Sequence, residues 1–346
     1  MEAGGEEGKG KSSVTRPEPA VPLAPVPLPP SGAARDGAEI ARQLTGLTRS
    51  GVGGGGGGGG PGGGSRLRFV KRVELEGELW EPEGIGDEGD ERFWVSAGEY
   101  TVPTEKFPGG RWEGGTDRSA GAGFAHMVVF DGRGRRLADW VLSEEGDLEY
   151  HNGGLDYDGR HIWATLSQYR PNTTGTVVRI DPAGLTMEAV LRVGDHQGGV
   201  ARDAETGTLT TLNWGGRTAR RWDLGERKGA REKGGDREQV ANPSHWVDYQ
   251  DCKSLGRVGG RRLMVCSGIA TAGPGGGLEV GGLAVVDAED MAAVWEAPFM
   301  ERTGGRGGVL MTKNPMDAAL VGGRARLYFA PEEGRGAVYV YEVCEG

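Results

Sequence analysis

The sequence contains no uninterrupted apolar run of about 18 residues, and this absence excludes a membrane-spanning helix. Basic residues form no stripe or cluster, and the formal net charge of −10 argues against nucleic acid as a partner. The first residues also lack the basic and apolar regions of a signal peptide. We therefore expect a monomeric, cytoplasmic protein that binds a small molecule, with no membrane or nucleic acid partner. Secretion is the alternative if the start of the chain is misassigned.

Cysteine is scarce as well. Cys252, Cys266 and Cys344 are too few and too dispersed for a structural zinc site. A hairpin that turns near Gly259 would place Cys252 directly opposite Cys266, close enough for a disulfide. Because structural disulfides are rare in a reducing compartment, we favour two buried thiols over a bond between them.

Helical periodicity is nearly absent, whereas glycine, at 67 residues, is far above its ordinary frequency. Closely spaced prolines among Ala, Gly and Glu predict that residues 1–35 form a disordered tail. In residues 36–65, Asp36 is suited to cap a short helix, and a run of glycines follows it as a linker. Residues 66–346 consist of short apolar runs broken by Gly, Asp and Pro, which is typical of many β-strands.

These expected strands repeat along the chain. An apolar residue followed by an acid ends the third strand of each repeat. These acids are Asp131, Asp181, Asp223, Asp287 and Glu342. Their spacings along the chain are 50, 42, 64 and 55 residues. Each interval matches one four-stranded propeller blade. The fifth repeat lacks a fourth strand, which the segment Arg66–Val73 is available to supply, closing the ring. We therefore predict an all-β fold, a β-propeller of five four-stranded blades. Six blades is the next alternative, because residues 225–239 fit either a loop or a degraded strand.

A histidine phrase occurs twice, as Tyr150–Leu155 and as Asp195–Val200, each time at the start of an innermost strand. Equivalent positions of a closed ring converge on its axis. The residues at these positions are Glu81, His151, His196, His245 and Asn314. Three imidazoles and a carboxylate suit a divalent transition metal, and the predicted ligands are Glu81, His151, His196 and His245. The alternative is that the histidines are structural and hold neighbouring blades together.

The second strand of each repeat returns to the same face of the ring, so its last residues are expected to surround the ligand. The predicted substrate-binding residues are Tyr169, Arg170, Trp214 and Arg217. The candidates for a catalytic base are Glu99 and Glu332. Carboxylates alone offer a second chemistry, an acid and base pair drawn from Glu81, Glu83, Asp195, Asp248, Asp251 and Glu332.

These positions predict a small polar ligand at the axial mouth and, as the reaction, metal-assisted hydrolysis of an ester, a lactone or a sugar derivative. The competing hypothesis is a non-catalytic propeller that serves as a scaffold for a protein or glycan. The two hypotheses require different surfaces. The first needs a closed polar pocket on the axis, and the second needs an exposed apolar or aromatic patch on one face.

Four phrases in combination resemble an uncharacterised family of bacterial and fungal proteins, known only as a domain of unknown function: Tyr150–Arg160, Tyr169–Asn172, Asp195–Val200 and Pro243–Cys252. The resemblance covers roughly residues 36–346. It implies a propeller-like fold, loosely similar to gluconolactonase-type propellers, and no known activity. Where that family has a His-Pro-Gln-Gly phrase, this chain has Glu81-Pro82-Glu83-Gly84, so a carboxylate replaces one axial histidine.

Overall fold

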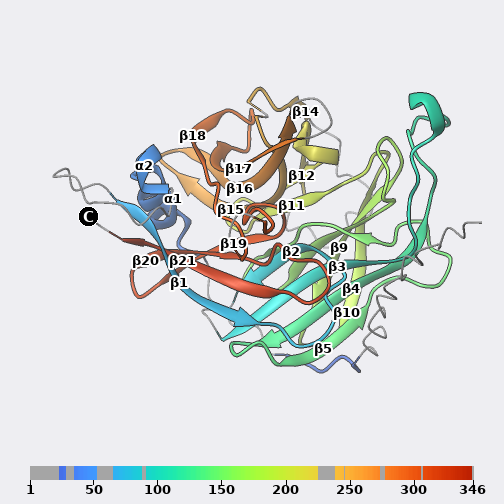
Figure 1. Cartoon of the computed structure of the whole chain (residues 1–346), viewed down its shortest axis with the longest axis horizontal. Coiled ribbons are helices and arrows are strands. Elements are labelled where there is room, and N and C mark those ends of the chain that lie inside the picture. Colours follow the sequence, from blue (N-terminus) through green and yellow to red (C-terminus); the bar gives the residue numbers. More distant parts are fainter. Residues whose placement is uncertain are drawn as a thin grey trace, which may run out of the picture.

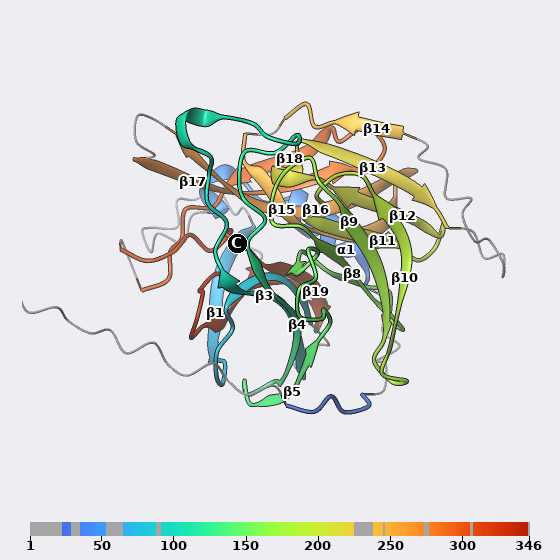
Figure 2. The same cartoon turned by 90° about the vertical axis from the view of Figure 1, so that its right-hand side faces the viewer.

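The computed structural model describes residues 23–28, 35–52, 65–87, 91–224, 238–244, 246–272, 277–304 and 307–344. Within these ranges the strands form five antiparallel sheets, which follow one another around a common axis (Figures 1 and 2). The innermost strands contact one another in order, and the last contacts the first. The ring is therefore closed, and the predicted five-bladed propeller is confirmed.

The blades are numbered in chain order, and each runs from the axis to the rim. Blade 1 consists of β2 (Glu81–Asp87), β3 (Arg92–Val102), β4 (Ala122–Asp131) and β5 (Arg136–Val141). Blade 2 consists of β6 (His151–Asn152) and β7 (Asp156–Tyr157), then β8 (Ile162–Ser167), β9 (Gly175–Asp181) and β10 (Thr186–Val193). Blade 3 consists of β11 (Gly199–Asp203), β12 (Thr208–Leu212), β13 (Thr218–Asp223) and β14 (Glu238–Ala241). Blade 4 consists of β15 (Asp248–Val258), β16 (Arg261–Ala272), β17 (Leu278–Asp287) and β18 (Ala293–Pro298). Blade 5 consists of β19 (Met316–Val321), β20 (Arg324–Phe329), β21 (Ala337–Cys344) and β1 (Arg66–Glu74).

The last blade is completed by the N-terminal strand, as predicted. Strand β1 pairs with β21 from Arg66, opposite Cys344, to Glu74, opposite Ala337. This pairing covers an edge of β21 that would otherwise be free. In blade 3, β14 supplies a fourth strand through its pairing with β13. The rest of the stretch that fits either a loop or a strand, residues 225–237, lies outside the described residues.

Two short helices precede the ring. Asp36 caps α1 (Gly37–Thr45) by accepting a hydrogen bond from the Glu39 backbone N–H at 3.2 Å, which confirms the predicted cap. Ile40 and Leu44 are fully buried in the apolar core shared by blades 4 and 5. Helix α2 (Arg49–Val52) follows, and both helices lie beside blade 4 (blue in Figure 1). No helix among the described residues is long and apolar enough to cross a membrane.

The connection between β3 and β4 contains the 3₁₀ turn η1 (Pro108–Gly110) and projects from the ring (teal, upper right in Figure 1). Part of the N-terminal stretch also contacts the blades. Leu28 packs into the core between blades 1 and 2, and its backbone N–H donates to the Pro182 carbonyl at 3.0 Å.

Cys252 and Cys266 face each other in the pairing of β15 with β16, as predicted from the hairpin. Their Cα atoms are 4.1 Å apart, and the two sulfurs form a disulfide. The expectation of two separate thiols is wrong. That expectation rested on the rarity of disulfides in a reducing compartment. The two residues lie directly opposite each other on neighbouring strands, which brings their sulfurs within bonding distance.

The disulfide predicts the thiol content of the protein. Denatured without reductant, the chain should expose one thiol, that of Cys344, and after reduction it should expose three. Alkylation followed by intact mass measurement counts them. A Cys344→Ser variant is the control and should show none before reduction. Three thiols in the unreduced chain would contradict the bond.

Candidate functional site

A pocket of about 120 Å³ opens on the axis, at the end of the ring where the innermost strands begin. All five blades line it, for example through Glu81, His151, Trp214, Tyr249 and Asn314. The sequence repeat places the site here because equivalent strand starts meet at the axis. Trp214 lies in the 3₁₀ turn η2 (Trp214–Gly216), which follows the second strand of blade 3.

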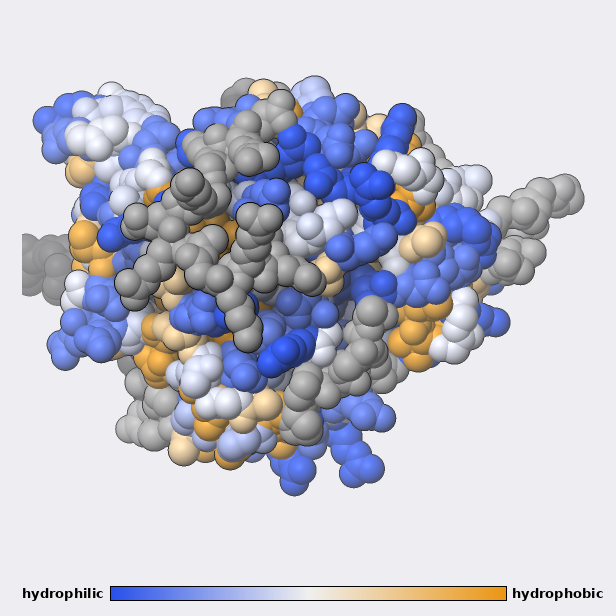
Figure 3. All heavy atoms as spheres, turned by 180° about the vertical axis from the view of Figure 1, so that it is seen from behind, coloured by the Kyte–Doolittle hydropathy of each residue, from blue (hydrophilic) through white to orange (hydrophobic). Residues whose placement is uncertain are grey.

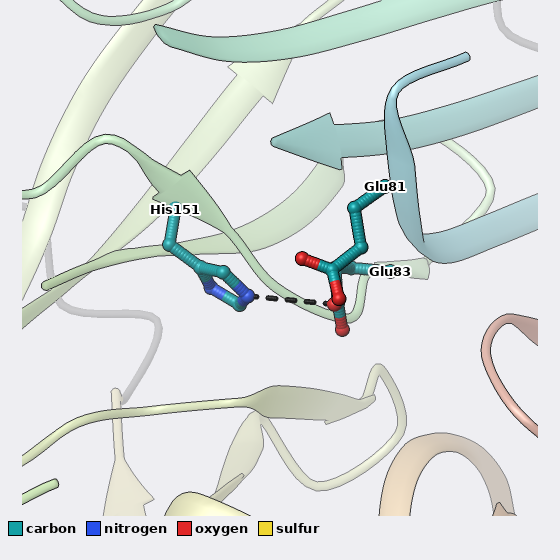
Figure 4. Close-up of side chains that lie close together, drawn as sticks. All are labelled: Glu81, Glu83 and His151. Atoms are coloured by element: carbon teal, nitrogen blue, oxygen red, sulfur yellow. Dashed lines mark ion pairs between the residues drawn. The ribbon is translucent and has the colours of Figure 1, made fainter. Parts of the chain in front are cut away.

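Two carboxylates and an imidazole meet in this pocket. Glu81 and Glu83 come from β2, and His151 comes from β6 in the next blade. The His151 Nε2 atom lies 3.5 Å from Glu83 Oε1, and Figure 4 shows the three side chains pointing toward one another. One ligand atom from each residue lies within 4.8 Å of the other two. A single cation can therefore contact all three.

The local backbone of β2 explains this convergence. The pairing of β2 with β3 shifts register between Pro82 and Gly84, so Glu83 occupies a β-bulge. Bulges redirect side chains and are common beside functional sites. At Gly84 a Cβ atom would lie 2.5 Å from the Leu155 backbone nitrogen. Only glycine allows blades 1 and 2 to approach this closely, and the close approach brings Glu83 to His151.

Burial changes the protonation of all three groups. Burial, followed by the charge of Glu83, raises the pKa of Glu81 to about 7. Burial also raises the pKa of Glu83 to about 8, against the opposing effect of Lys313. The pKa of His151 falls to about 4 because burial disfavours the imidazolium. Near pH 7 the site therefore holds a neutral imidazole and at least one protonated carboxyl group, so a bound cation would displace protons.

Several buried polar atoms around the pocket lack a hydrogen-bond partner among the described residues. They include Glu81 Oε2, His151 Nδ1 and Asn314 Oδ1. Other atoms of these residues are well bonded: Tyr169 donates its hydroxyl to Glu81 Oε1 at 3.1 Å, and Asn314 Nδ2 donates to Glu83 Oε2 at 2.6 Å. Leaving buried polar atoms unpaired costs about 1–3 kcal/mol each. The unpaired atoms therefore indicate a site built to contact a ligand.

Aromatic rings form one wall of the pocket. Tyr169 stacks between Tyr100, at 4.8 Å, and His151, at 4.7 Å, with the planes within 11° of parallel. Trp214 lies edge-on to a second histidine, His196, at 4.7 Å, and the Arg118 guanidinium covers Trp214 at 4.5 Å. Because Tyr100 and His151 cover the two faces of Tyr169, and Arg118 covers Trp214, these contacts make the wall rigid and keep water out of it.

Comparison with known sequences identifies the family. The profile of a family of unknown function, DUF6454, matches residues 113–344, more than half of the chain. The chain belongs to the DUF6454 family. The resemblance inferred from the sequence phrases is thereby confirmed. In this DUF6454 protein the matched region contains His151 and His196, whereas Glu81 and Glu83 lie before it.

The solved structures that match this chain have low sequence identity to it. A luciferin-regenerating enzyme is 8% identical, with 79% of this chain and 95% of the enzyme covered and a TM-score of 0.42. The calcium-binding protein regucalcin from Agrobacterium tumefaciens is 9% identical, with 80% and 95% covered and a TM-score of 0.43. No curated protein matches the chain.

Of the four predicted metal ligands, Glu81 and His151 lie together in the cluster, and Glu83 is the third member. His196 lines the same pocket, with its ring centroid 5.2 Å from that of His151, but is not part of the cluster. Its Nδ1 is 2.7 Å from the Gln168 backbone carbonyl, a contact that fixes the ring between blades. His245 lies outside the described residues.

Tyr169 and Trp214, predicted to bind substrate, line the pocket. The two predicted arginines do not. Arg170 donates two hydrogen bonds to Gln168 Oε1, at 2.9 and 2.6 Å, and Arg217 pairs with Asp248 at 2.5 Å. Both guanidinium groups already have an acceptor, so neither is assigned to substrate binding here.

Neither predicted base lines the pocket. Glu99 Oε2 lies 3.2 Å from His126 Nε2, within blade 1. Glu332 accepts a hydrogen bond from the Tyr339 hydroxyl at 3.1 Å. Its neighbour Glu333 faces the pocket instead, where it pairs with Lys313. Both glutamates lie in the connection between β20 and β21, and Glu333 is in a bend, so their side chains point in different directions.

The Lys313–Glu333 pair is the part of the pocket that sequence reasoning missed. Lys313 directly precedes Asn314, which does stand at a predicted axial position. The pKa of Lys313 is raised because the hydrogen bond and charge of Glu333 outweigh the effect of burial. The signal that could have identified Lys313 is its place at the start of the innermost strand of blade 5.

Figure 3 shows one outer face of the molecule, coloured by the hydropathy of each residue. Hydrophilic residues predominate among the described residues visible on that face, and apolar residues form separate groups between them. The scaffold hypothesis requires a contiguous apolar patch, whereas the polar axial pocket is the feature that the small-ligand hypothesis requires.

Proposed function

We propose that this DUF6454 protein binds a divalent transition-metal cation through Glu81, Glu83 and His151, and that the loaded pocket hydrolyses an ester, a lactone or a sugar derivative. The supporting observation is the convergence of one atom from each of these side chains within 4.8 Å, inside a polar pocket. The further unpaired atoms Glu81 Oε2, His151 Nδ1 and Asn314 Oδ1 add to this support.

The donor set fits such a cation. Two carboxylates and one neutral imidazole suit manganese, iron or zinc, whereas calcium prefers oxygen ligands alone. The lowered pKa of His151 keeps its imidazole in the neutral form that binds metals. Tyr169 donates to Glu81 and Asn314 donates to Glu83, and such partners orient ligating carboxylates.

When bound, a cation in this position would polarise a carbonyl or ring oxygen and favour attack by water. The chain itself supplies a hydrogen-bond acceptor. His196 donates its Nδ1–H to the Gln168 carbonyl, so the other ring nitrogen, Nε2, carries the lone pair. The pKa of His196 is lowered to about 3 by burial and then by His151, which keeps the ring neutral. A ring with so low a pKa takes up a proton poorly, so His196 is assigned to accept a hydrogen bond from the attacking water and orient it, in place of Glu99 or Glu332.

The remaining pocket residues would bind and orient the substrate. The rings of Tyr169 and Trp214 line the pocket and would make the apolar contacts with the substrate. Lys313 and Glu333, which pair with each other, line the same pocket and would meet the substrate as a charged pair.

The cation site predicts binding that depends on His151. Protein stripped with a chelator should take up about one equivalent of Mn²⁺ or Zn²⁺, and His151→Ala should lose at least about tenfold in affinity. Binding should tighten from pH 6 to pH 8, because Glu81 and Glu83 lose the protons that compete with the cation. Calorimetry and elemental analysis measure both effects.

The matched control is His161→Ala. His161 belongs to the same blade but lies beside Asp158, 3.9 Å away, and does not line the pocket. Equal cation binding by the two variants would refute the site. A panel of lactones, esters and glycosides, assayed with the loaded protein, tests the reaction separately. Cation binding without hydrolysis of any of them would leave a binding function and reject the hydrolase.

A further inference from the structure

A second charged centre lies at the other end of the axis from the pocket. Glu81, at the start of β2, lines the pocket, whereas Asp87, at the end of β2, donates its backbone N–H to Asp317 Oδ2 at 2.8 Å. Beside Asp317 lies the guanidinium of Arg35, which directly precedes the cap of α1. This centre is separate from the proposed cation site.

The Arg35 guanidinium contacts three blades. Its Nη1 lies 2.9 Å from Asp156 Oδ1 in blade 2, and its Nη2 lies 2.7 Å from Asp317 Oδ1 in blade 5. Its Nε donates to the Ala318 carbonyl at 2.8 Å, and Nη1 also donates to the Ser254 carbonyl of blade 4 at 3.2 Å. The planar fork of an arginine satisfies these acceptors together, which the single ammonium of a lysine cannot do.

The ring builds the acceptors without help from the N-terminal segment. Asp156 is fully buried, and its Oδ2 accepts the backbone N–H groups of Ser254 and Arg202 at 3.0 and 2.8 Å. Asp317, 2% exposed, is held in the same way by Asp87. The oxygen of each carboxylate that faces Arg35 also accepts one backbone N–H of the ring, from Tyr157 to Asp156 Oδ1 and from Ala318 to Asp317 Oδ1, so Arg35 supplies the opposite charge rather than the first hydrogen bond. Two buried carboxylates without a cation would be strongly unfavourable.

The arginine belongs to a segment that is distinct from the ring in sequence. Residues 35–52 contain Arg35 and the two helices, and residues 53–64, almost all glycine, connect them to β1. The segment packs on the ring through Ile40 and Leu44. Glycine-rich sequence imposes little conformational preference on a connection, so the docking of the segment depends on its own contacts.

We propose that Asp156, Asp317 and the carbonyls of Ser254 and Ala318 form a guanidinium-binding site, and that this site docks the chain's own N-terminal segment, residues 35–52, through Arg35. The site recognises an arginine side chain, and the helix that follows this arginine in sequence packs its apolar face on the ring. The guanidinium adds contacts to blades 2, 4 and 5 beside those that the ring makes by itself.

The first test is chemical rescue in the full chain. Arg35→Ala should lower the midpoint of thermal unfolding by about 5 °C or more, because it leaves two buried carboxylates unpaired. Methylguanidinium at millimolar concentration should restore a large part of this loss, and methylammonium should not. Arg42→Ala is the control: it removes an equal charge from α1, where the exposed Arg42 side chain pairs with Glu39, and it should change little. If Arg35→Ala does not fold on expression, refolding yields with each of the two cations give the same comparison.

The second test addresses docking. A protease site inserted among the glycines of residues 53–60 allows the folded protein to be cut once. The N-terminal fragment should remain with the ring during gel filtration in the parent and in Arg42→Ala, and should separate in Arg35→Ala. Equal stability of Arg35→Ala and the parent, equal effects of both cations, or retention of the Arg35→Ala fragment would overturn the proposal.

Discussion

Replacing Glu83 with glutamine should abolish cation binding and, at the same time, stabilise the cation-free protein at high pH. Glutamine keeps an oxygen that can accept the hydrogen bond from Asn314, but it offers no charge to a cation. The pKa of Glu83 is about 8 in the folded protein and about 4.5 when the chain is unfolded. Between these values the folded state holds a proton that the unfolded state has released, so stability falls as the pH rises from about 4.5 to about 8 and levels off above that.

The expected gain in stability of Glu83→Gln is large because the pKa of Glu83 differs strongly between the folded and the unfolded state. Glutamine cannot ionise, and at pH 9 the variant should exceed the parent by roughly 4 kcal/mol, with the gap closing below pH 5. Urea unfolding in the presence of a chelator at pH 5, 7 and 9 measures it. Glu333→Gln, which changes a half-exposed carboxylate of the same pocket, is the control and should show no such trend. A Glu83→Gln variant that is destabilised equally at every pH would show that Glu83 serves the fold rather than a ligand.

Replacing Lys253 with methionine should be among the most damaging single changes in the ring. Its side chain is fully buried, and its Nζ contacts Asp251 Oδ1 at 2.7 Å and the Leu155 carbonyl. Methionine leaves the carboxylate of Asp251 buried without its opposite charge, which costs about 3–5 kcal/mol. Burial already raises the pKa of Asp251 to about 7 even with the lysine present. Below that pH Asp251 can take up a proton, so the loss should be smaller at pH 5 than at pH 8.

A double-mutant cycle separates the energy of the Asp251–Lys253 ion pair from the effect of packing at the same positions. Asp251→Asn should restore much of the stability of Lys253→Met at pH 8, because an amide oxygen can still accept the Met316 backbone N–H. Lys313→Met is the matched control. Lys313 pairs with Glu333 near the surface, and its replacement should cost less than about 1 kcal/mol. Similar losses of stability for both lysine variants would mean that burial does not determine how much the Asp251–Lys253 pair contributes to stability.

The blade architecture was predictable because local signals repeat. Four of the acids used to count the blades do end a third strand: Asp131 in β4, Asp181 in β9, Asp223 in β13 and Asp287 in β17. The last buried residue of such a strand is apolar, and the acid after it begins the turn. Both features involve only neighbouring residues, so they can be recognised in the sequence. The closing role of β1 followed from counting, since one blade lacked a strand.

The site was predictable in position but only in part in composition. Glu81 and His151 follow from the strand starts. Glu83 enters the cluster through a bulge that depends on how β2 pairs with β3, and no local signal in the sequence specifies that register. His196 is drawn toward the Gln168 carbonyl instead, which is a contact between the start of one blade and the second strand of the previous one.

Long-range partners explain what sequence reasoning missed. The composition around Arg35 favours disorder, and the two carboxylates that bind it lie 121 and 282 residues further along the chain. The cysteine pair shows the opposite case. Fourteen residues and one turn separate Cys252 from Cys266, so their opposition could be predicted even though the bond was not.

The pairing of β1 with β21 also has a consequence for synthesis on the ribosome. Arg72 and Tyr339, opposite each other in this pairing, are 267 residues apart. The first strand therefore emerges long before its partner exists, and blades 1 to 4 can form while it waits as an exposed edge. Such an edge invites pairing with other chains, and its basic side chains, Arg66, Arg68, Lys71 and Arg72, oppose that pairing by mutual repulsion. The charge of β1 thus protects the nascent chain during the period when the ring is open.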